Sequence, residues 1–242
     1  MKVVAIIPAR LASTRLSRKM LREIAGQPLL AWVYRAVERS PKLATVIVAT
    51  DSDEIQAFCR QHGFNVQMTS PNHRSGTERV HEISNSVSAD VYLNVQGDEP
   101  LTRPEHIESL IAVMQNSDVQ VGTLKTPAAE GDINNPSSVK VVTGSAGRAL
   151  YFSRATIPHD RDHIHPPYYK HLGFYAYRKP ALDKFVSWPE SPLEHSERLE
   201  QLRFLENGVS IQVAETPYDT VGVDTEEDLK RVEEILRKRS VF

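Results

Sequence analysis

Short apolar segments alternate with amphipathic segments through the first hundred residues, and this alternation restricts the possible folds more than any other feature. Runs of apolar or β-branched residues at 3–7, 45–50 and 91–95 predict buried strands. Residues 66–68 suggest a further, shorter strand. Helical patterns lie between these runs or follow them, at residues 28–37, 52–62, 76–87 and 103–115. Strands joined by helices of this length form right-handed crossovers, so the sequence predicts an α/β fold with a mainly parallel sheet.

The pattern changes after about residue 119. Two short β-rich runs at 139–142 and 149–152 flank a turn-like segment and predict paired strands. The aperiodic stretch 158–167, rich in His, Asp and Pro, predicts a surface loop. Further strands are expected at 172–177 and 211–214, and helices at 193–206 and 226–239. We therefore expect one α/β domain over residues 1–242, with an inserted β-rich arm at about 136–170.

Composition excludes several classes of protein. The 242 residues include 29 Lys plus Arg and 31 Asp plus Glu, and the resulting net charge of −2 argues against nucleic-acid binding through bulk charge. No apolar run approaches the roughly 20 residues of a membrane-spanning helix, and no signal peptide is expected. The single cysteine, Cys59, cannot form an internal disulfide and is expected in the core. A cytoplasmic enzyme without membrane or nucleic-acid partners is the expectation.

A cationic segment follows the first predicted strand. Residues 8–19 contain four basic residues and no acid. The loop after the first strand of an open α/β sheet lies at the carboxyl edge, where ligands bind. The segment lacks the glycines of a phosphate-binding loop, so its Arg and Lys side chains must supply the phosphate contacts. A solvated basic loop is the alternative interpretation.

Two aspartates sit at the ends of predicted elements. Asp98 directly follows the strand at 91–95, and Asp224 directly precedes the last helix. Mg²⁺ in phosphate chemistry takes one or two protein carboxylates and completes its shell with phosphate oxygens and water. The alternatives are a turn residue for Asp98 and a helix cap for Asp224.

A third segment, residues 73–79, places small and hydroxyl side chains at a helix start. Such a start offers backbone amides and Ser or Thr oxygens to a base or a phosphate. Ordinary capping by Ser75 or Thr77 would explain the same residues without a ligand.

Taken together, these segments resemble the 3-deoxy-manno-octulosonate cytidylyltransferase family, also called the CMP-Kdo synthetases. The resemblance runs in order from about residue 3 to residue 235. It rests on residues 7–10, 12–16, 49–51, 75–79, 94–100, 150–158, 193–195, 199–203 and 222–225.

The resemblance implies a single Rossmann-like nucleotidyltransferase domain with a β-rich dimerisation arm. The implied reaction transfers CMP from CTP to the anomeric hydroxyl of 3-deoxy-D-manno-octulosonate (Kdo), giving CMP-Kdo and pyrophosphate for lipopolysaccharide synthesis. Mg²⁺ is the implied cofactor, held by Asp98 and Asp224. The implied roles are triphosphate binding by Arg10, Arg15 and Lys19; cytidine binding by Ala9, Ser75, Gly76, Arg79 and Gln96; and a sugar-acid pocket of Arg154, His171, Tyr175, Glu200 and Gln201. A homodimer is also implied, with residues 139–158 of the arm as the contact.

Two departures from the family pattern concern loops. Ser17 and Arg18 stand where the family usually has Pro-Gly, and the loss of glycine disfavours a positive φ at this point. Arg18 is therefore expected either to point to solvent or to contact a phosphate. The histidine-rich stretch 160–171 could alter substrate access, and its spacing matches no common structural zinc site.

Other functions stay open at this point. Within the same class, the sugar substrate could be 8-amino-Kdo or a sialic acid, because two or three polar contacts decide such a preference. A metal-dependent glycosyltransferase using Asp98, or a catalytically inactive nucleotide-binding module, would belong to other classes.

Overall fold

The computed structural model describes residues 1–11 and 16–239. The chain divides into two compact units. The first comprises Met1–Glu108 and Thr220–Phe242, and the second comprises Ser109–Asp219. The expected single domain over 1–242, with its arm at about 136–170, stays a prediction.

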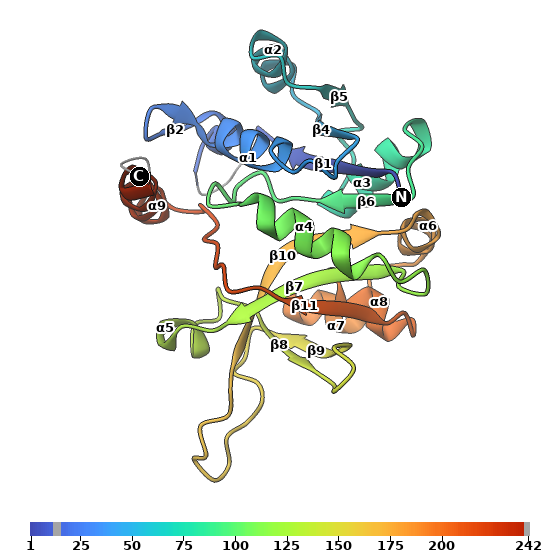
Figure 1. The fold of residues 1–242 in the computed structure, drawn as a ribbon, viewed down its shortest axis with the longest axis vertical. Helices are drawn as coiled ribbons and strands as arrows, with labels where there is room; N and C mark the ends of the chain where they lie inside the picture. Colours follow the sequence, from blue (N-terminus) through green and yellow to red (C-terminus); the bar gives the residue numbers. More distant parts are fainter. Residues whose placement is uncertain (12–15, 240–242) are drawn as a thin grey trace. The chain divides into compact units, whose positions relative to one another are not determined.

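The sheet of the first unit consists of parallel strands in the order β5-β4-β1-β6 (Figure 1). The bounds are β1 Val3–Ala9, β4 Thr45–Thr50, β5 Val66–Met68 and β6 Val91–Asn94. The central strand β1 is almost fully buried, as its continuous apolar sequence requires. The mainly parallel sheet predicted for the first hundred residues is confirmed.

Helices connect these strands in the expected places. They are α1 Leu29–Glu38, α2 Asp53–Gln61 and α3 Gly76–Ser86, and α9 Glu226–Arg239 follows at the C-terminal end of this unit. Helix α1 packs on β1 and β4, and α3 packs on β1, β4 and β6. A 3₁₀ turn, η1 (Lys19–Leu21), and the small strand pair β2 (Glu23–Ile24) and β3 (Gln27–Pro28) occupy the connection from β1 to α1. The carboxyl ends of β1 and β6 thus lie next to each other, which brings their loops together.

The second unit has a mixed sheet. Strand β7 (Val121–Pro127) pairs in parallel with β11 (Ile211–Glu215) and antiparallel with β10 (Tyr169–Tyr177). Strand β8 (Lys140–Thr143) forms a hairpin with β9 (Ala149–Ser153) and also touches β10. The paired strands expected at 139–142 and 149–152 are therefore confirmed. Strand β7 was not predicted, because its central glycine and lysine interrupt the apolar pattern.

The helices of this unit correct one expectation. They are α5 Glu130–Ile133, α6 Lys179–Ser187, α7 Pro192–Glu197 and α8 Leu202–Glu206, while α4 (Pro104–Val113) crosses from the first unit into the second. The single helix expected at 193–206 is wrong, since α7 ends and α8 begins within that range. Arg198 adopts the left-handed conformation, with φ 54°, and thereby ends α7.

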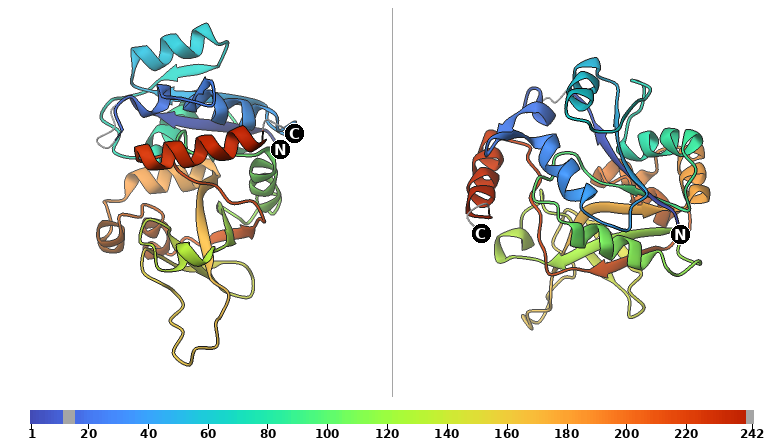
Figure 2. Two further views of the ribbon diagram at one scale, coloured as in Figure 1. Left: turned by 90° about the vertical axis from the view of Figure 1, so that its left-hand side faces the viewer. Right: turned by 45° about the horizontal axis from the view of Figure 1, so that its top comes forward.

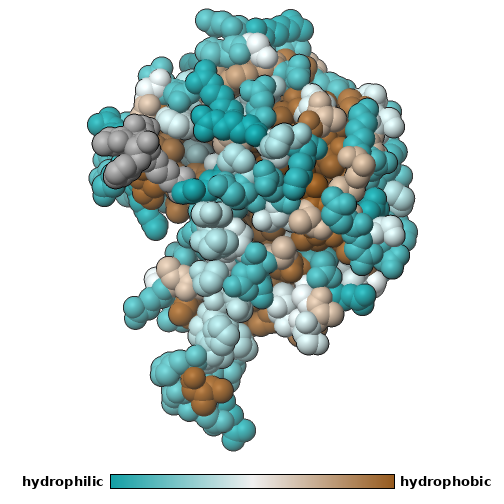
Figure 3. Space-filling view, in the orientation of Figure 1, coloured by the Kyte–Doolittle hydropathy of each residue, from teal (hydrophilic) through white to brown (hydrophobic). Residues whose placement is uncertain are grey.

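A long connection links β9 to β10 and projects from the hairpin (Figures 1 and 2). It has no helix or strand, so the predicted surface loop at 158–167 is confirmed. Hydrophobic surface is visible at its far end (Figure 3), and Ile164 there has an exposed fraction of 78%. None of the helices in the described ranges combines the length and the apolar character needed to cross a membrane.

Candidate functional site

The centre of the candidate site is one ammonium group held between two carboxylates. Lys19 Nζ lies 2.6 Å from Asp98 Oδ2 and 2.9 Å from Asp224 Oδ1. The two aspartates are 126 positions apart in the sequence, and both of their carboxylates contact this ammonium group. Their convergence is the geometry on which the proposed pairing of these residues depends.

Local backbone structure brings the aspartates together. The loop after β6 turns through a hydrogen bond from Glu99 N to Gln96 O, which confirms that Asp98 lies in a turn. Val223 N then donates to Asp98 O at 2.9 Å, so the segment before α9 is bonded to this turn. Asp224 follows directly and lies beside Asp98.

Helix α9 fixes the second aspartate through its cap. Thr225 caps the helix, because its hydroxyl accepts from Asp228 N, while Asp228 Oδ2 accepts from Thr225 N and from the threonine hydroxyl. Asp228 also accepts from Asp224 N at 3.1 Å. The interpretation of Asp224 as the helix cap is therefore wrong, and the Asp224 carboxylate is available to Lys19.

The electrostatics of this cluster favour a bound cation. Burial by itself lowers the pKa of Lys19, but the charges and hydrogen bonds of Asp98 and Asp224 outweigh it, and the pKa lies above its ordinary value. The side chains of Asp98 and Asp224 are 27% and 43% exposed, so the cluster opens to solvent. Two carboxylates that converge on one positive group are hard oxygen donors of the kind that hold divalent cations with additional phosphate and water oxygens.

Gly97 allows the loop to lie this close to β1. A Cβ at this position would stand 2.9 Å from Pro8 O and 3.2 Å from Met20 Sδ. Backbone oxygen cannot yield to such a contact, so only glycine fits without moving the loop. The position of Asp98 therefore depends on the glycine that precedes it, Gly97.

Arg18 adopts the backbone conformation that a glycine would adopt most easily. Its φ is 55° and its ψ is 32°, in the left-handed region, immediately before η1. Its guanidinium pairs with the carboxylate of Glu54, and its side chain is 61% exposed. Arg18 thus adopts a positive φ although it is not glycine, and Lys19 follows it at the start of η1. Arg18 meets Glu54 as well as solvent.

Two further candidates, Ala9 and Arg10, lie at the end of β1 and directly after it. Ala9 is fully buried at the end of β1. The guanidinium of Arg10 donates to the backbone carbonyl of His73. Arg15, also predicted to bind triphosphate, lies outside the described residues.

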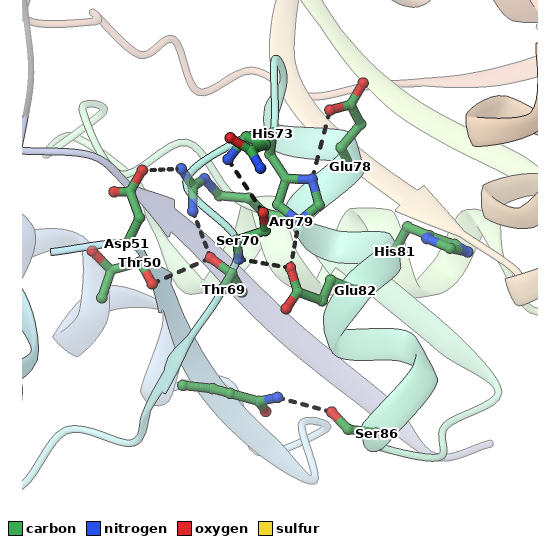
Figure 4. Close-up of polar contacts among 12 residues, drawn as sticks. Thr50, Asp51, Thr69, Ser70, His73, Glu78, Arg79, His81, Glu82 and Ser86 are labelled. Atoms are coloured by element: carbon green, nitrogen blue, oxygen red, sulfur yellow. Dashed lines mark hydrogen bonds and ion pairs between the residues drawn. The ribbon is translucent and has the colours of Figure 1, made fainter.

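The residues predicted to bind cytidine are held by contacts within the unit (Figure 4). Ser75 caps α3 by accepting from Glu78 N at 3.2 Å, so the capping interpretation is confirmed. Arg79 is fully buried and donates to Asp51 Oδ2 at 2.6 Å and to Thr69 Oγ1 at 2.5 Å. These bonds tie the start of α3 to the ends of β4 and β5.

Gly76 lies beside a buried amide, that of Asn94, which sequence reasoning missed. The side chain of Asn94 is fully buried on β6, and neither of its amide atoms has a hydrogen-bond partner among the described residues. A Cβ on Gly76 would lie 3.4 Å from Asn94 Nδ2. The signal was a single amide within the apolar run 91–95. Gln96, two residues further, is half-buried in the loop.

In the second unit, Arg154 is anchored at the end of β9. Its Nε donates to Glu197 O at 2.8 Å and its Nη1 to Pro136 O at 3.0 Å. The Glu197 carboxylate accepts in turn from Arg154 N and from the Ser153 hydroxyl. This leaves Nη2 as the donor without a bond to the part of the chain described.

His171 and Tyr175 lie together on β10. Their ring centroids are 5.4 Å apart, and His171 Nε2 lies 3.0 Å from Thr123 Oγ1. Burial lowers the pKa of His171 to about 3, so its imidazole is neutral at physiological pH. As a sugar-acid ligand it could therefore offer a neutral hydrogen bond, and not a positive charge.

Glu200 and Gln201 occupy the connection between α7 and α8. Gln201 is 4% exposed, and its Nε2 has no hydrogen-bond partner within the described ranges. A buried ion pair holds the two helices: Arg203 Nε and Nη2 donate to the two oxygens of Glu194 at 2.7 Å and 2.5 Å. Both residues lie in segments that carry the family resemblance, 193–195 and 199–203, but their pairing was not predicted.

One other prediction is confirmed. Cys59 is buried, and burial raises the pKa of its thiol to about 12, which fits a core residue. In residues 1–11 and 16–239, no three His, Cys, Asp or Glu side chains gather as a metal site, and this includes the histidine-rich loop. Asp160 in that loop instead accepts from Ile164 N and His165 N.

Comparison with known proteins extends these observations over the whole chain. Residues 4–211 match the family model described as cytidylyltransferase. The 3-deoxy-manno-octulosonate cytidylyltransferase of Koribacter versatilis is 66% identical over 99% of this chain and 92% of its own length. The enzyme of the same name from Acidobacterium capsulatum is 55% identical over 99% of this chain and 98% of its own length.

Solved structures agree. A CMP:2-keto-3-deoxy-manno-octonic acid synthetase complexed with CTP matches 99% of this chain and 100% of its own, with a TM-score of 0.95 and 38% identity. A 4-diphosphocytidyl-2C-methyl-D-erythritol synthase from Anaerococcus prevotii shares the fold, with a TM-score of 0.65 and 16% identity over 98% of each chain. This chain belongs to the 3-deoxy-manno-octulosonate cytidylyltransferase family of nucleotidyltransferases.

Proposed function

We propose that this chain transfers the cytidylyl group of CTP to the anomeric hydroxyl of Kdo, giving CMP-Kdo and pyrophosphate for lipopolysaccharide synthesis. The observation that carries the proposal is the meeting of Asp98 and Asp224 at the Lys19 ammonium. The names of the close relatives and the CTP complex of the matching structure support the choice of CTP and Kdo.

Asp98 and Asp224 would hold Mg²⁺ in this account. The donor set fits, because both carboxylates already face one cationic group and stay partly exposed. When bound with CTP, the ion would neutralise phosphate charge and lower the pKa of the attacking hydroxyl. Lys19 is the balancing cation of the nucleotide-free protein, and its ammonium is within reach of the same phosphates.

The reaction forms a bond from the anomeric oxygen of Kdo to the α-phosphorus and breaks the bond from that phosphorus to the bridging oxygen of pyrophosphate. Such a displacement requires an in-line arrangement and neutralised phosphate charge more than covalent help. Lys19, with Arg10 and Arg15, would supply this neutralisation. The hydroxyl proton passes to solvent water as the new bond forms.

The cytidine would lie against the end of β1 and the start of α3. Ala9, Ser75, Gly76, Arg79 and Gln96 are the residues assigned to it. Ser75 already caps α3, so its backbone N–H and the first helical amides are the donors best placed for the nucleoside or its phosphates.

The second unit would supply the sugar-acid ligands. Arg154 is fixed through two of its nitrogens, and its Nη2 is the group we assign to the Kdo carboxylate. His171, Tyr175, Glu200 and Gln201 would contribute neutral or acidic contacts to the sugar hydroxyls. The preference for Kdo over 8-amino-Kdo or a sialic acid would depend on this set.

We also propose a homodimer in which the arm forms the contact. Leu150 on β9 and Ile164 on the loop are 65% and 78% exposed, and contact with a second copy of the arm would remove this apolar surface from water. Replacing both by aspartate should convert a dimer to a monomer in light scattering. A wild-type monomer would contradict the proposal.

The test of the function is pyrophosphate release from CTP. We expect release only when Kdo and Mg²⁺ are both present, and faster release with Kdo than with 8-amino-Kdo or a sialic acid at equal concentrations. Release without any sugar acid, or no release with Kdo, would contradict the assignment.

A further inference from the structure

The loop between β5 and α3, residues 69–75, is fixed at several points by the helix that follows it (Figure 4). Glu82, on the second turn of α3, accepts from Ser70 N at 2.9 Å and from His73 Nε2 through the same carboxylate oxygen. Glu78, one turn earlier, accepts from Arg74 N at 2.7 Å. The helix thus holds the loop that leads into its own first turn.

His73 connects this arrangement to the nucleotide site. Its imidazole lies between the two glutamates, with Nδ1 3.6 Å from Glu78 Oε2, while its backbone carbonyl accepts from the guanidinium of Arg10. The side chain of His73 is therefore held by α3, and its backbone carbonyl is bonded to Arg10.

The other side of the loop is fixed independently. Thr69 N and Thr69 Oγ1 donate to Thr50 O, and Thr69 Oγ1 accepts from Arg79. The beginning of the loop is thereby bonded to β4, so the adjustable part is the stretch from Ser70 to Arg74. Glu82 contacts both Ser70 and His73 within that stretch.

The charge state of Glu82 suits this role. Burial favours its neutral form, but the hydrogen bond from Ser70 N and the interactions with His73 and Arg79 outweigh burial and lower its pKa. A carboxylate that is ionised at neutral pH accepts both bonds without needing a proton of its own.

We infer that Glu82 is a positioning residue of the CTP site: by holding Ser70 and His73 it fixes the carbonyl that orients Arg10, and with it the start of α3. The inference rests on the proposed function, since the ligand is the triphosphate assigned to Arg10. It concerns the binding of CTP and not the sugar acid.

The first test measures CTP affinity by titration calorimetry and turnover by pyrophosphate release. Glu82→Ala should weaken CTP binding about tenfold and raise the KM for CTP to match, because a displaced Arg10 loses its phosphate geometry. The KM for Kdo should stay within about twofold. Glu82→Gln should recover most of the affinity, because its amide oxygen still accepts from Ser70 N.

Ser86→Ala is the matched control. It removes a hydrogen bond of 2.9 Å from Gln67 Nε2, which also joins β5 to α3 but lies away from the loop. We expect unchanged CTP affinity. His73→Ala offers a second variant if Glu82→Ala folds poorly, because it removes the side-chain donor to Glu82 but keeps the backbone carbonyl; its CTP affinity should fall by about threefold or more.

A double-mutant cycle separates positioning from general stability. If Glu82 acts through Arg10, adding Glu82→Ala to Arg10→Ala should weaken CTP binding no further than Arg10→Ala alone. Multiplicative effects, or wild-type CTP affinity in Glu82→Ala, would overturn the inference. If the wild-type protein binds CTP but releases no pyrophosphate in the presence of Kdo, the proposed function is contradicted. The CTP affinities measured by calorimetry would still test the role of Glu82.

Discussion

The two units use their charged residues in different ways. In the first, Lys19, Asp98 and Asp224 meet in a cluster with partly exposed carboxylates, an arrangement open to exchange with a ligand. In the second, Arg203 and Glu194 are nearly fully buried, with side chains 5% and 9% exposed. Buried pairs of this kind fix helices, whereas open clusters bind ions and phosphates.

Lys140 extends the contrast. It is fully buried in the second unit, and its ammonium donates to the carbonyls of Asn135, Ser138 and Arg154 at 2.8, 2.6 and 2.7 Å. Desolvation lowers its pKa. This cation is fully used in holding the backbone around Arg154, whereas the carboxylates that hold Lys19 in the first unit remain partly exposed.

The largest effect should come from the open cluster. Asp98→Asn should lower kcat/KM for CTP by about a thousandfold or more, since a proposed metal ligand is lost. Thermal melting should shift little, because Lys19 keeps Asp224. Asp53→Asn changes an exposed acid on α2 and is the control; it should retain full activity. Near-wild-type turnover in Asp98→Asn would mean that the open cluster of the first unit does not differ in function from the buried pair of the second.

For the buried pair of Glu194 and Arg203, we expect a large effect on stability and a small effect on activity. Glu194→Gln should lower the free energy of unfolding by about 3 kcal/mol, because the Arg203 guanidinium stays buried with a weaker partner. Asp183→Asn, which breaks an exposed pair on α6, should cost less than about 0.5 kcal/mol. Urea denaturation provides both values. A loss of activity in folded Glu194→Gln at low temperature would show that this pair serves the chemistry directly.

His171 adds a pH-dependent test of the second unit. Its pKa is about 3 in the folded protein and about 6.5 in the unfolded chain. The unfolded state therefore binds the extra proton first, and stability from this group is present above about pH 6.5 and is lost as the pH falls. Between pH 7 and 5 the loss should be about 2 kcal/mol.

The measurement is the difference in unfolding free energy between pH 7 and pH 5. His171→Gln, which keeps a donor toward Thr123, should show a difference smaller than that of the wild type by about 2 kcal/mol. Equal differences in the two proteins would mean that the imidazole is hydrated in the folded protein, which contradicts its burial.

The smallest effect concerns the backbone beside Lys19. Arg18→Gly should change the unfolding free energy by less than about 1 kcal/mol, since relief of the left-handed conformation is offset by the greater freedom of glycine in the unfolded chain. Arg18→Val should destabilise by about 1–2 kcal/mol, because a β-branched residue resists positive φ. Equal stability of both variants would contradict the conformation assigned to this loop.

Sequence reasoning succeeded where a local pattern determines structure. The strand at 45–50 and the helix at 76–87 follow from short-range rules and are present. The aspartates could be paired because parallel strand ends share one edge and because the motifs resembled a known family.

Sequence reasoning failed where contacts between residues far apart in the sequence determine the structure. Strand β7 lacks a clear apolar run and is defined by its pairing with β10 and β11. The break between α7 and α8 depends on Arg198, whose left-handed backbone no propensity predicts. Arg79 was expected to contact cytidine, but its partners Asp51 and Thr69 come from two other segments and are visible only in three dimensions.

Electron–nuclear double resonance of the Mn²⁺–CTP complex of protein labelled with ¹³C at the aspartate carboxyl groups tests the central claim most directly. The account predicts a ¹³C coupling from protein carboxylates to the metal, weaker in Asp98→Asn or Asp224→Asn and absent in the double variant. A CTP-bound complex whose metal shows no aspartate coupling in the wild type would contradict it.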